Sequence, residues 1–170
     1  MAVNLVVLKE AAPETRVAAT PETVKKMAAM GISVTLEAGA GSASGFADAD
    51  YKSAGATVTK ALAGALKKAD VVFGVRAPKA AQVKAMKAGA ALVATLNPYQ
   101  DAAGVKTYKT AKIQAMAMEL MPRITRAQSM DILSSQSNLA GYKAVLDATA
   151  EYVRALPMMM TAAGTVPAAR

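Results

Sequence analysis

Short apolar runs alternate with segments of helical pattern through the first 120 residues, and this alternation constrains the fold more than any other feature of the chain. The apolar runs cover residues 3–8, 32–36, 56–59, 70–75, 90–96 and 113–118. Helical patterns cover residues 21–30, 48–54, 60–69, 80–88 and 101–110. Repeated strand–helix–strand units make consecutive strands parallel. The alternation therefore predicts an α/β domain over residues 1–120, with a mostly parallel sheet covered by helices on both faces.

The core of this domain must be built mainly from small and aliphatic side chains. Aromatic residues make up only 4% of a chain that is 54% hydrophobic. The chain has no Cys and no His, which excludes disulfides, thiol nucleophiles, histidine bases and zinc sites made from these ligands. No metal site is expected, and methionines are expected to fill the core. These are Met116, Met118, Met121, Met158, Met159 and Met160.

The net charge of +8 comes mainly from lysines spaced along the predicted helices. Such spacing is typical of solvated outer faces, and no aromatic residues are interleaved as in nucleic-acid-binding motifs. We therefore expect no nucleic-acid partner. No run approaches the roughly 18 apolar residues that span a bilayer, and residues 1–8 lack the basic start of a signal peptide. The expectation is a cytoplasmic protein without direct membrane insertion.

The glycine-rich loop at residues 39–45 follows a predicted strand and precedes a predicted helix, like a dinucleotide-binding loop. Its last motif position is Ser44, where close helix packing requires glycine or alanine. No acidic residue ends a second strand about twenty residues later, where it would hold the ribose. These departures favour a connection at the carboxyl edge of the sheet over a phosphate site.

Residues 121–138 form a polar segment, and residues 139–156 show the apolar spacing of a long interdomain helix that ends before Pro157. A helical turn in the polar segment would place Gln128, Asp131, Ser134 and Ser135 on one face. Such a face can hold a planar carboxamide or a sugar-phosphate, and it can equally be an exposed linker surface. The predicted organisation is thus a Rossmann-like or flavodoxin-like domain (1–120), a polar segment (121–138) and a long helix with a tail (139–170).

The polar segment also carries a resemblance to a known family. The run from Met118 to Tyr142, MELMPRITRAQSMDILSSQSNLAGY, is similar to the signature of the NAD-binding component of proton-translocating NAD(P)+ transhydrogenases, as is PMMMTAAGTVP at 157–167. The N-terminal region resembles the wider family shared with alanine dehydrogenase. This likeness rests on KE at 9–10, RVA at 16–18, TP at 20–21, EAGAG at 37–41, DADY at 48–51 and AGA at 54–56.

The resemblance implies that the polar segment lines the nicotinamide end of an NAD(H) site. Arg123, Gln128, Asp131 and Ser134 match the cofactor-binding positions, with Gln128 and Asp131 closest to catalysis. Hydride would pass from NADH to NADP+ bound on a separate domain, which needs orientation and electrostatics but no histidine base. The implied partners are the NADP(H)-binding and membrane-spanning components of a transhydrogenase, which would hold the chain at the inner membrane.

The family also implies a following Rossmann domain for the adenine and pyrophosphate of NAD. We therefore expect these 170 residues, as a piece of a truncated or split subunit, to bind NAD(H) weakly by themselves. The resemblance also implies a homodimer, and an apolar helix and tail would otherwise lose their cover. We therefore expect these residues either to self-associate or to leave residues 157–170 disordered.

Two alternatives remain open. One is an alanine-dehydrogenase-like oxidoreductase, whose oxo-acid site would use Arg16 but would find Arg76 and Asn97 in place of a lysine and a histidine. The other is a non-catalytic module that docks on other subunits.

Overall fold

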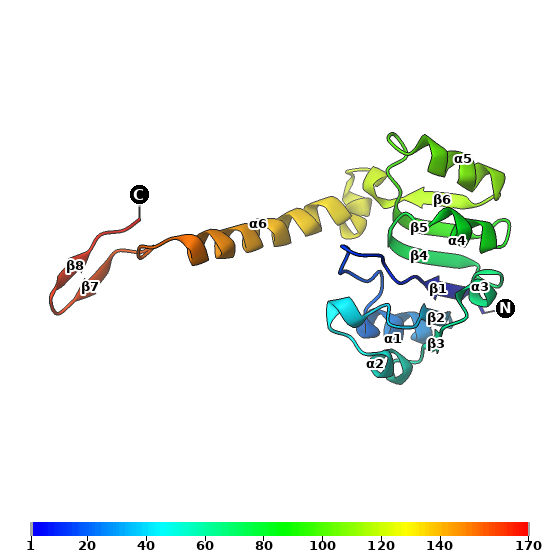
Figure 1. Ribbon diagram of the computed structural model, residues 1–170, viewed down its shortest axis with the longest axis horizontal. Coiled ribbons are helices and arrows are strands. Elements are labelled where there is room, and N and C mark those ends of the chain that lie inside the picture. The colour runs from blue at the N-terminus through cyan, green and yellow to red at the C-terminus, as the bar shows by residue number, and fades with distance from the viewer. Residues whose placement is uncertain (1, 170) are drawn as a thin grey trace. The chain divides into compact units, whose positions relative to one another are not determined.

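The computed structural model describes residues 2–169 and divides into two compact units, Met1–Pro122 and Arg123–Arg170. The first unit is built on six strands in the order β3-β2-β1-β4-β5-β6, and every neighbouring pair is parallel (Figure 1). The predicted α/β class with a parallel sheet is confirmed. The strands are β1 (Asn4–Val7), β2 (Ser33–Glu37), β3 (Thr57–Thr59), β4 (Val71–Arg76), β5 (Ala91–Thr95) and β6 (Gln114–Ala117).

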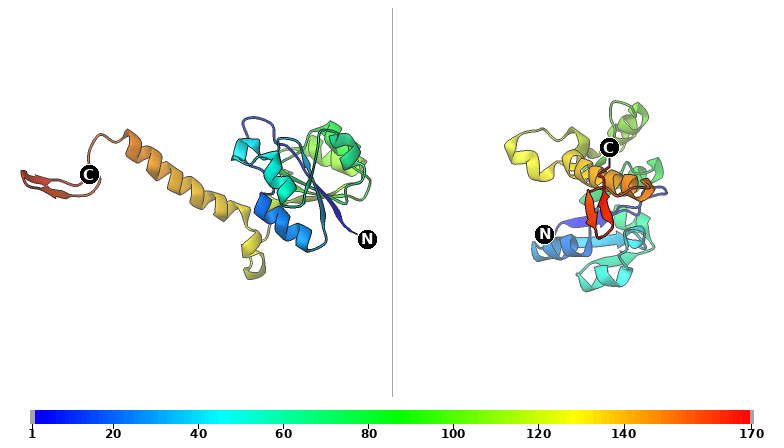
Figure 2. Two further views of the ribbon diagram at one scale, coloured as in Figure 1. Left: turned by 90° about the horizontal axis from the view of Figure 1, so that it is seen from below. Right: turned by 90° about the vertical axis from the view of Figure 1, so that its left-hand side faces the viewer.

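Helices cover both faces of this sheet (Figure 2). They are α1 (Pro21–Ala29), α2 (Asp48–Ser53), α3 (Leu62–Leu66), α4 (Ala80–Ala85) and α5 (Ala102–Thr110). Alternate residues from Leu5 to Leu8, in β1 and directly after it, enter different cores. Leu5 and Val7 pack with the side chains of α1 and α2, whereas Val6 and Leu8 pack with those of α3, α4 and α5. The period-two pattern of a central strand thus builds two apolar layers.

Local sequence signals fix several helix starts. Thr20 caps α1 by accepting a hydrogen bond from the Thr23 amide, and Pro21 occupies the first turn, where no amide partner is needed. Asp101 caps α5 by accepting a hydrogen bond from the Gly104 amide. Helix α3 is shorter than the predicted segment 60–69, because Ala61 has a non-helical backbone and Lys67 already forms the cap at the other end.

The glycine loop is a packed connection. The Gly39 amide donates to Asp48 Oδ1 at 2.9 Å, and Gly39 and Gly45 have positive φ angles. Gly41 lies against the buried ring of Tyr51, so a Cβ atom there would stand 2.5 Å from Tyr51 Cε2. The Tyr51 hydroxyl donates to the Ala19 carbonyl at 2.9 Å. The glycines are therefore explained by turn geometry and close packing, in keeping with the connection at the sheet edge expected from the sequence.

The second unit contains the 3-10 helix η3 (Thr125–Met130), helix α6 (Ile132–Glu151) and an antiparallel hairpin of β7 (Met159–Thr161) and β8 (Gly164–Val166). The predicted helix at 139–156 was wrong at both ends. Helix α6 begins earlier because Asp131 caps it. It ends earlier because Tyr152 is extended, and the Leu156 carbonyl then accepts a hydrogen bond from the Ala169 amide at the base of the hairpin.

The prediction that the methionines fill the core was also wrong for several of them. Met116 lies on edge strand β6 and is half exposed, and Met158, Met159 and Met160 are exposed in the second unit. An edge strand and a two-stranded hairpin offer too few neighbours to bury such side chains. Among the described helices, none is both long and apolar enough to cross a membrane.

Candidate functional site

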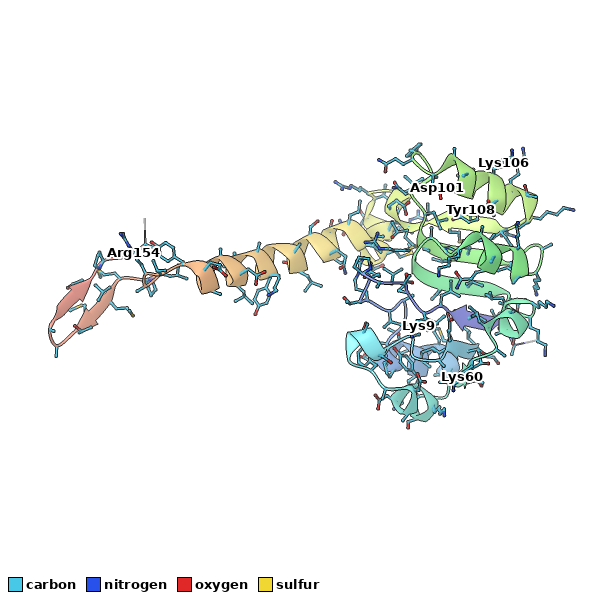
Figure 3. All side chains as sticks on the ribbon, viewed as in Figure 1. Lys9, Lys60, Asp101, Lys106, Tyr108 and Arg154 are labelled. Atoms are coloured by element: carbon cyan, nitrogen blue, oxygen red, sulfur yellow. The ribbon has the colours of Figure 1, made fainter. Side chains whose placement is uncertain are left out.

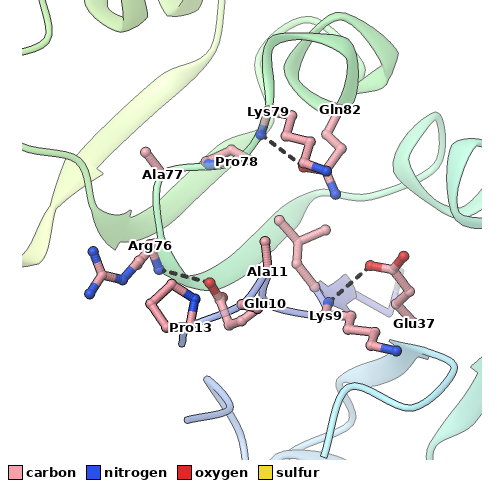
Figure 4. A pocket seen from close by; sticks show the side chains of 12 residues that line it. Lys9, Glu10, Ala11, Pro13, Glu37, Arg76, Ala77, Pro78, Lys79 and Gln82 are labelled. Atoms are coloured by element: carbon pink, nitrogen blue, oxygen red, sulfur yellow. Dashed lines mark hydrogen bonds between the residues drawn. The ribbon is translucent and has the colours of Figure 1, made fainter. Parts of the chain in front are cut away.

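The order of the strands places a crevice at the carboxyl edge of the first unit, between β1 and β4. The chain leaves β1 toward β2 on one side and returns to β4 on the other side. At such a switch point the loops diverge, and open α/β sheets bind ligands there. A cavity of about 430 Å³ occupies this position (Figure 4). It is lined by residues 8–13 after β1, by Glu37, by residues 76–79 at the end of β4 and after it, and by Gln82.

Carboxylates of the chain itself accept hydrogen bonds from three backbone amides at the edge of this crevice. Glu10 accepts hydrogen bonds from the amides of Val75 at 2.7 Å and Arg76 at 3.3 Å, and so joins the loop after β1 to the end of β4. Glu37 accepts a hydrogen bond from the Lys9 amide at 2.9 Å (Figure 4). Free amides of this kind hold phosphates in dinucleotide-binding sheets. Here the amides of Lys9, Val75 and Arg76 already donate to side-chain carboxylates.

An ion cluster joins the two loops. Arg16 donates to both carboxylate oxygens of Glu14, from Nε and from Nη2, each at 2.8 Å. Arg76 donates from Nε to the same carboxylate at 2.9 Å. The Glu14 side chain is 5% exposed, whereas the two guanidinium groups are about half exposed or more. The hydrogen bonds from Arg16, with a smaller contribution from the hydrogen bond of Arg76, outweigh burial and hold the pKa of Glu14 far below its usual range.

The structure therefore brings together Arg16 and Arg76 across Glu14, but it gives Asn97 other partners. Asn97 follows β5, and its amide and that of Leu96 donate to the Glu119 carboxylate. Its side chain donates to Gln100 at 2.8 Å. The sequence analysis did not predict a role for Glu10, Glu14 or Glu37. An acidic residue one or two positions after a predicted strand, as at 37 and 10, was the available signal.

In the second unit, the carboxylate of Asp131 organises the polar segment. It accepts hydrogen bonds at Oδ1 from the amides of Leu133 at 2.8 Å and Ser134 at 3.1 Å, and at Oδ2 from the Ser134 hydroxyl at 2.7 Å. The Ser134 hydroxyl, the Ser134 and Leu133 amides and the nearby charge of Arg123 lower the pKa of Asp131. Three of the four predicted residues, Arg123, Asp131 and Ser134, are thus electrostatically linked.

The prediction that one helical face carries Gln128, Asp131, Ser134 and Ser135 was wrong. Gln128 lies on η3 and is exposed, and Asp131 has an extended backbone with ψ 104° between η3 and α6. The reason is the competition between helix continuation and capping: Asp131 uses its carboxylate to satisfy the first amides of α6 and so breaks the helix before it. Gln128 and Ser134 therefore belong to two different helical elements.

Comparison with known proteins decides the family. Residues 6–140 match the family model described as alanine dehydrogenase/PNT, N-terminal domain, a range that includes the crevice and all four predicted residues of the polar segment. The chain belongs to the alanine dehydrogenase/PNT family.

Relatives of this alanine dehydrogenase/PNT chain include transhydrogenases and an L-alanine dehydrogenase. The chain is 50% identical to the first part of the alpha subunit of NAD(P) transhydrogenase from Rhodospirillum rubrum. That match covers 98% of this chain and 45% of the relative. The crystal structure of transhydrogenase from Sinorhizobium meliloti has a TM-score of 0.89 and 51% identity, and the match covers 98% of this chain and 50% of that one. An L-alanine dehydrogenase structure has a TM-score of 0.65 and 29% identity over 69% of this chain and 32% of that one. The chain therefore spans about half the length of the transhydrogenase relatives.

Proposed function

We propose that this chain is the N-terminal portion of the NAD(H)-binding component of an NAD(P)+ transhydrogenase, in which hydride passes from NADH to NADP+ and is coupled to proton translocation. The observation that carries this proposal is the sequence identity of 50–51% with transhydrogenases, which extends over 98% of the chain. The alanine dehydrogenase structure is only 29% identical over a shorter match.

The polar segment fits the nicotinamide end of such a cofactor. Asp131 Oδ2 accepts one hydrogen bond, from Ser134, and a carboxylate oxygen can accept a second. A carboxamide amine is a suitable donor for that position. The exposed Gln128 amide can both donate and accept, and Arg123 adds a positive charge near Asp131. In this proposal, Ser134 fixes the direction of the carboxylate before the cofactor arrives.

The nicotinamide supplies the hydride, and the residues of this chain have to hold its ring at the correct distance and angle. Direct hydride transfer moves no proton to or from a side chain, so the absence of His from the sequence is compatible with it. The low pKa of Asp131 keeps its carboxylate charged, which preserves its role as an acceptor.

We also propose that the complete protein works as a homodimer with NADP(H)-binding and membrane-spanning partners, and is peripheral to the membrane through them. The related Rhodospirillum rubrum chain is named as the first portion of its subunit, which supports the existence of further portions. Large apolar side chains are exposed along α6 and the hairpin, which supports contact with another chain. They include Leu139, Tyr142, Val145, Leu146 and Met160.

The competing function is an alanine-dehydrogenase-like oxidation of an amino acid. Arg76 lines the crevice and, together with Arg16, favours a carboxylate ligand, but Glu14 already binds both guanidinium groups. Amino-acid oxidation also requires a general base, and the described crevice contains no histidine.

A paired assay separates the two functions. The complete subunit, reconstituted with its partners in vesicles, is given NADH with an NADP+ analogue in one reaction and NAD+ with L-alanine in another. We expect hydride transfer in the first reaction only. NAD+ reduction that depends on L-alanine, without transfer between nucleotides, would contradict the proposal.

A further inference from the structure

The net charge of the protein is concentrated in one region of the fold. Residues 60–112 contain ten Lys and Arg residues but only two acidic residues, Asp70 and Asp101, so their net charge is +8. This equals the net charge of the entire chain. Residues 1–59, which include α1 and α2, contain five basic and six acidic residues and are nearly neutral. One helical layer of the sheet is therefore strongly basic, and the opposite layer is not.

Six of these lysines lie at the amino edge of the sheet, where α3, α4 and α5 end. Lys87 pairs with Asp70, whose carboxylate also accepts a hydrogen bond from the Asn4 amide at the start of β1. The Lys112 carbonyl accepts a hydrogen bond from the Gly89 amide before β5. We call Lys67, Lys68, Lys84, Lys87, Lys109 and Lys112 the amino-edge lysine cluster; all six are exposed.

Helix energetics explain only some of this arrangement. A lysine near a helix C-terminus is favourable because it offsets the negative end of the macrodipole. This accounts for Lys84 and Lys109 in the last turns of α4 and α5, as it does for Lys26 in α1. It does not account for the shortage of acidic residues around α3, α4 and α5. Side chains that end in nitrogen atoms extend outward from these helices, as Lys106 does on α5 (Figure 3).

The chemistry of the surface favours a lipid headgroup layer over a folded partner. Protein interfaces contain an apolar or aromatic centre and are depleted in lysine. Between residues 60 and 112, the exposed large apolar side chains are Tyr99 and Val105. Single-stranded nucleic acids need a series of stacking aromatics, which two such residues do not provide. A fluid anionic surface requires neither shape complementarity nor an anchor, and lysines close to it each add to the attraction.

We propose that the amino-edge lysine cluster adsorbs the protein to an anionic membrane surface. The contact is electrostatic and involves no insertion. It leaves the carboxyl edge of the first unit, with its crevice, directed away from the lipid. This inference rests on the charge and exposure of one edge of the sheet and does not depend on the transhydrogenase proposal.

Sedimentation with vesicles tests the proposal. The purified protein is mixed with vesicles of phosphatidylcholine alone or with about one third phosphatidylglycerol. One triple variant carries Lys67→Gln, Lys84→Gln and Lys109→Gln. The matched control carries Lys9→Gln, Lys60→Gln and Lys79→Gln, which remove the same charge from the carboxyl edge of the sheet, after β1, β3 and β4. Thermal unfolding checks that both variants are folded.

We expect the wild type to bind only the anionic vesicles, with binding that weakens as salt is added. The amino-edge variant should lose about a hundredfold in partitioning, which corresponds to roughly fivefold for each lysine. The control variant should lose much less. Equal losses in the two variants, no binding to anionic vesicles, or tighter binding to duplex DNA than to the vesicles would each overturn the proposal.

Discussion

The Ser134 hydroxyl donates a 2.7 Å hydrogen bond to the Asp131 carboxylate, whose other oxygen caps helix α6. One side chain thus has two tasks: it fixes the start of a 20-residue helix and presents an oriented acceptor within the proposed nicotinamide site. The two tasks can be separated, because capping requires only an acceptor oxygen, whereas the electrostatic role requires the charge.

Replacement of Asp131 should therefore affect α6 in a graded way. Asp131→Ala removes the acceptor for the Leu133 and Ser134 amides, and we expect their hydrogen exchange to accelerate markedly. Asp131→Asn keeps an acceptor oxygen and should accelerate exchange much less. Ser135→Ala is the matched control, since the Ser135 hydroxyl donates only to the Asp131 backbone carbonyl. Equal exchange rates in the Ala and Asn variants would argue against capping by this side chain.

Glu14→Gln should destabilise the protein by about 2 kcal/mol, because a buried carboxylate loses charge-assisted hydrogen bonds to Arg16 and Arg76. The loss should depend on pH. The pKa of Glu14 is lowered in the folded state, so its contribution is fully present above the unfolded value of about 4.3 and is lost as pH falls toward the folded value. Urea unfolding should give a constant difference between wild type and variant from pH 5 to 8, which shrinks below about pH 4. A difference that grows in acid would contradict the ion cluster.

Gly41→Ala should destabilise the first unit by about 1–3 kcal/mol, the usual cost of overpacking. The added Cβ would stand 2.5 Å from Tyr51 Cε2, and this ring is fully buried. Gly64→Ala is the control: it lies within α3 with nothing within 4 Å of the new atom, and it should stabilise by about 0.5–1 kcal/mol. Similar melting temperatures for the two variants would show that the glycine loop is not held by this packing.

The elements of the first unit could be predicted from the sequence because each one carries its own local pattern. The alternating residues of β1 and the Thr20–Pro21 start of α1 are examples. The crevice could not be predicted, because it depends on strand order. Glu10 lies 65 residues from Val75 in the chain, and no local pattern indicates that they meet.

In the polar segment, the sequence indicated the residues but not their arrangement. Its residues were selected by resemblance, and their roles at the cofactor remain a prediction. The helical spacing used to arrange them failed at Asp131, because a side chain that can cap a helix can also interrupt one. The predicted helix bounds of 139 and 156 were wrong for a related reason. Apolar spacing shows which side chains would share a face, but it does not show where a cap begins the helix or where a returning hairpin ends it.

Single-turnover hydride transfer in the complete subunit, combined with its NADP+-binding partner, tests the central claim most directly. Arg123→Ala and Asp131→Asn are compared with wild type, and the NADH dissociation constant is measured for each. We predict that the rate constant falls about ten- to a hundredfold with a smaller change in NADH affinity, because the nicotinamide loses its orientation. Unchanged rate constants with weakened NADH binding would contradict the proposed role of this segment in positioning the nicotinamide.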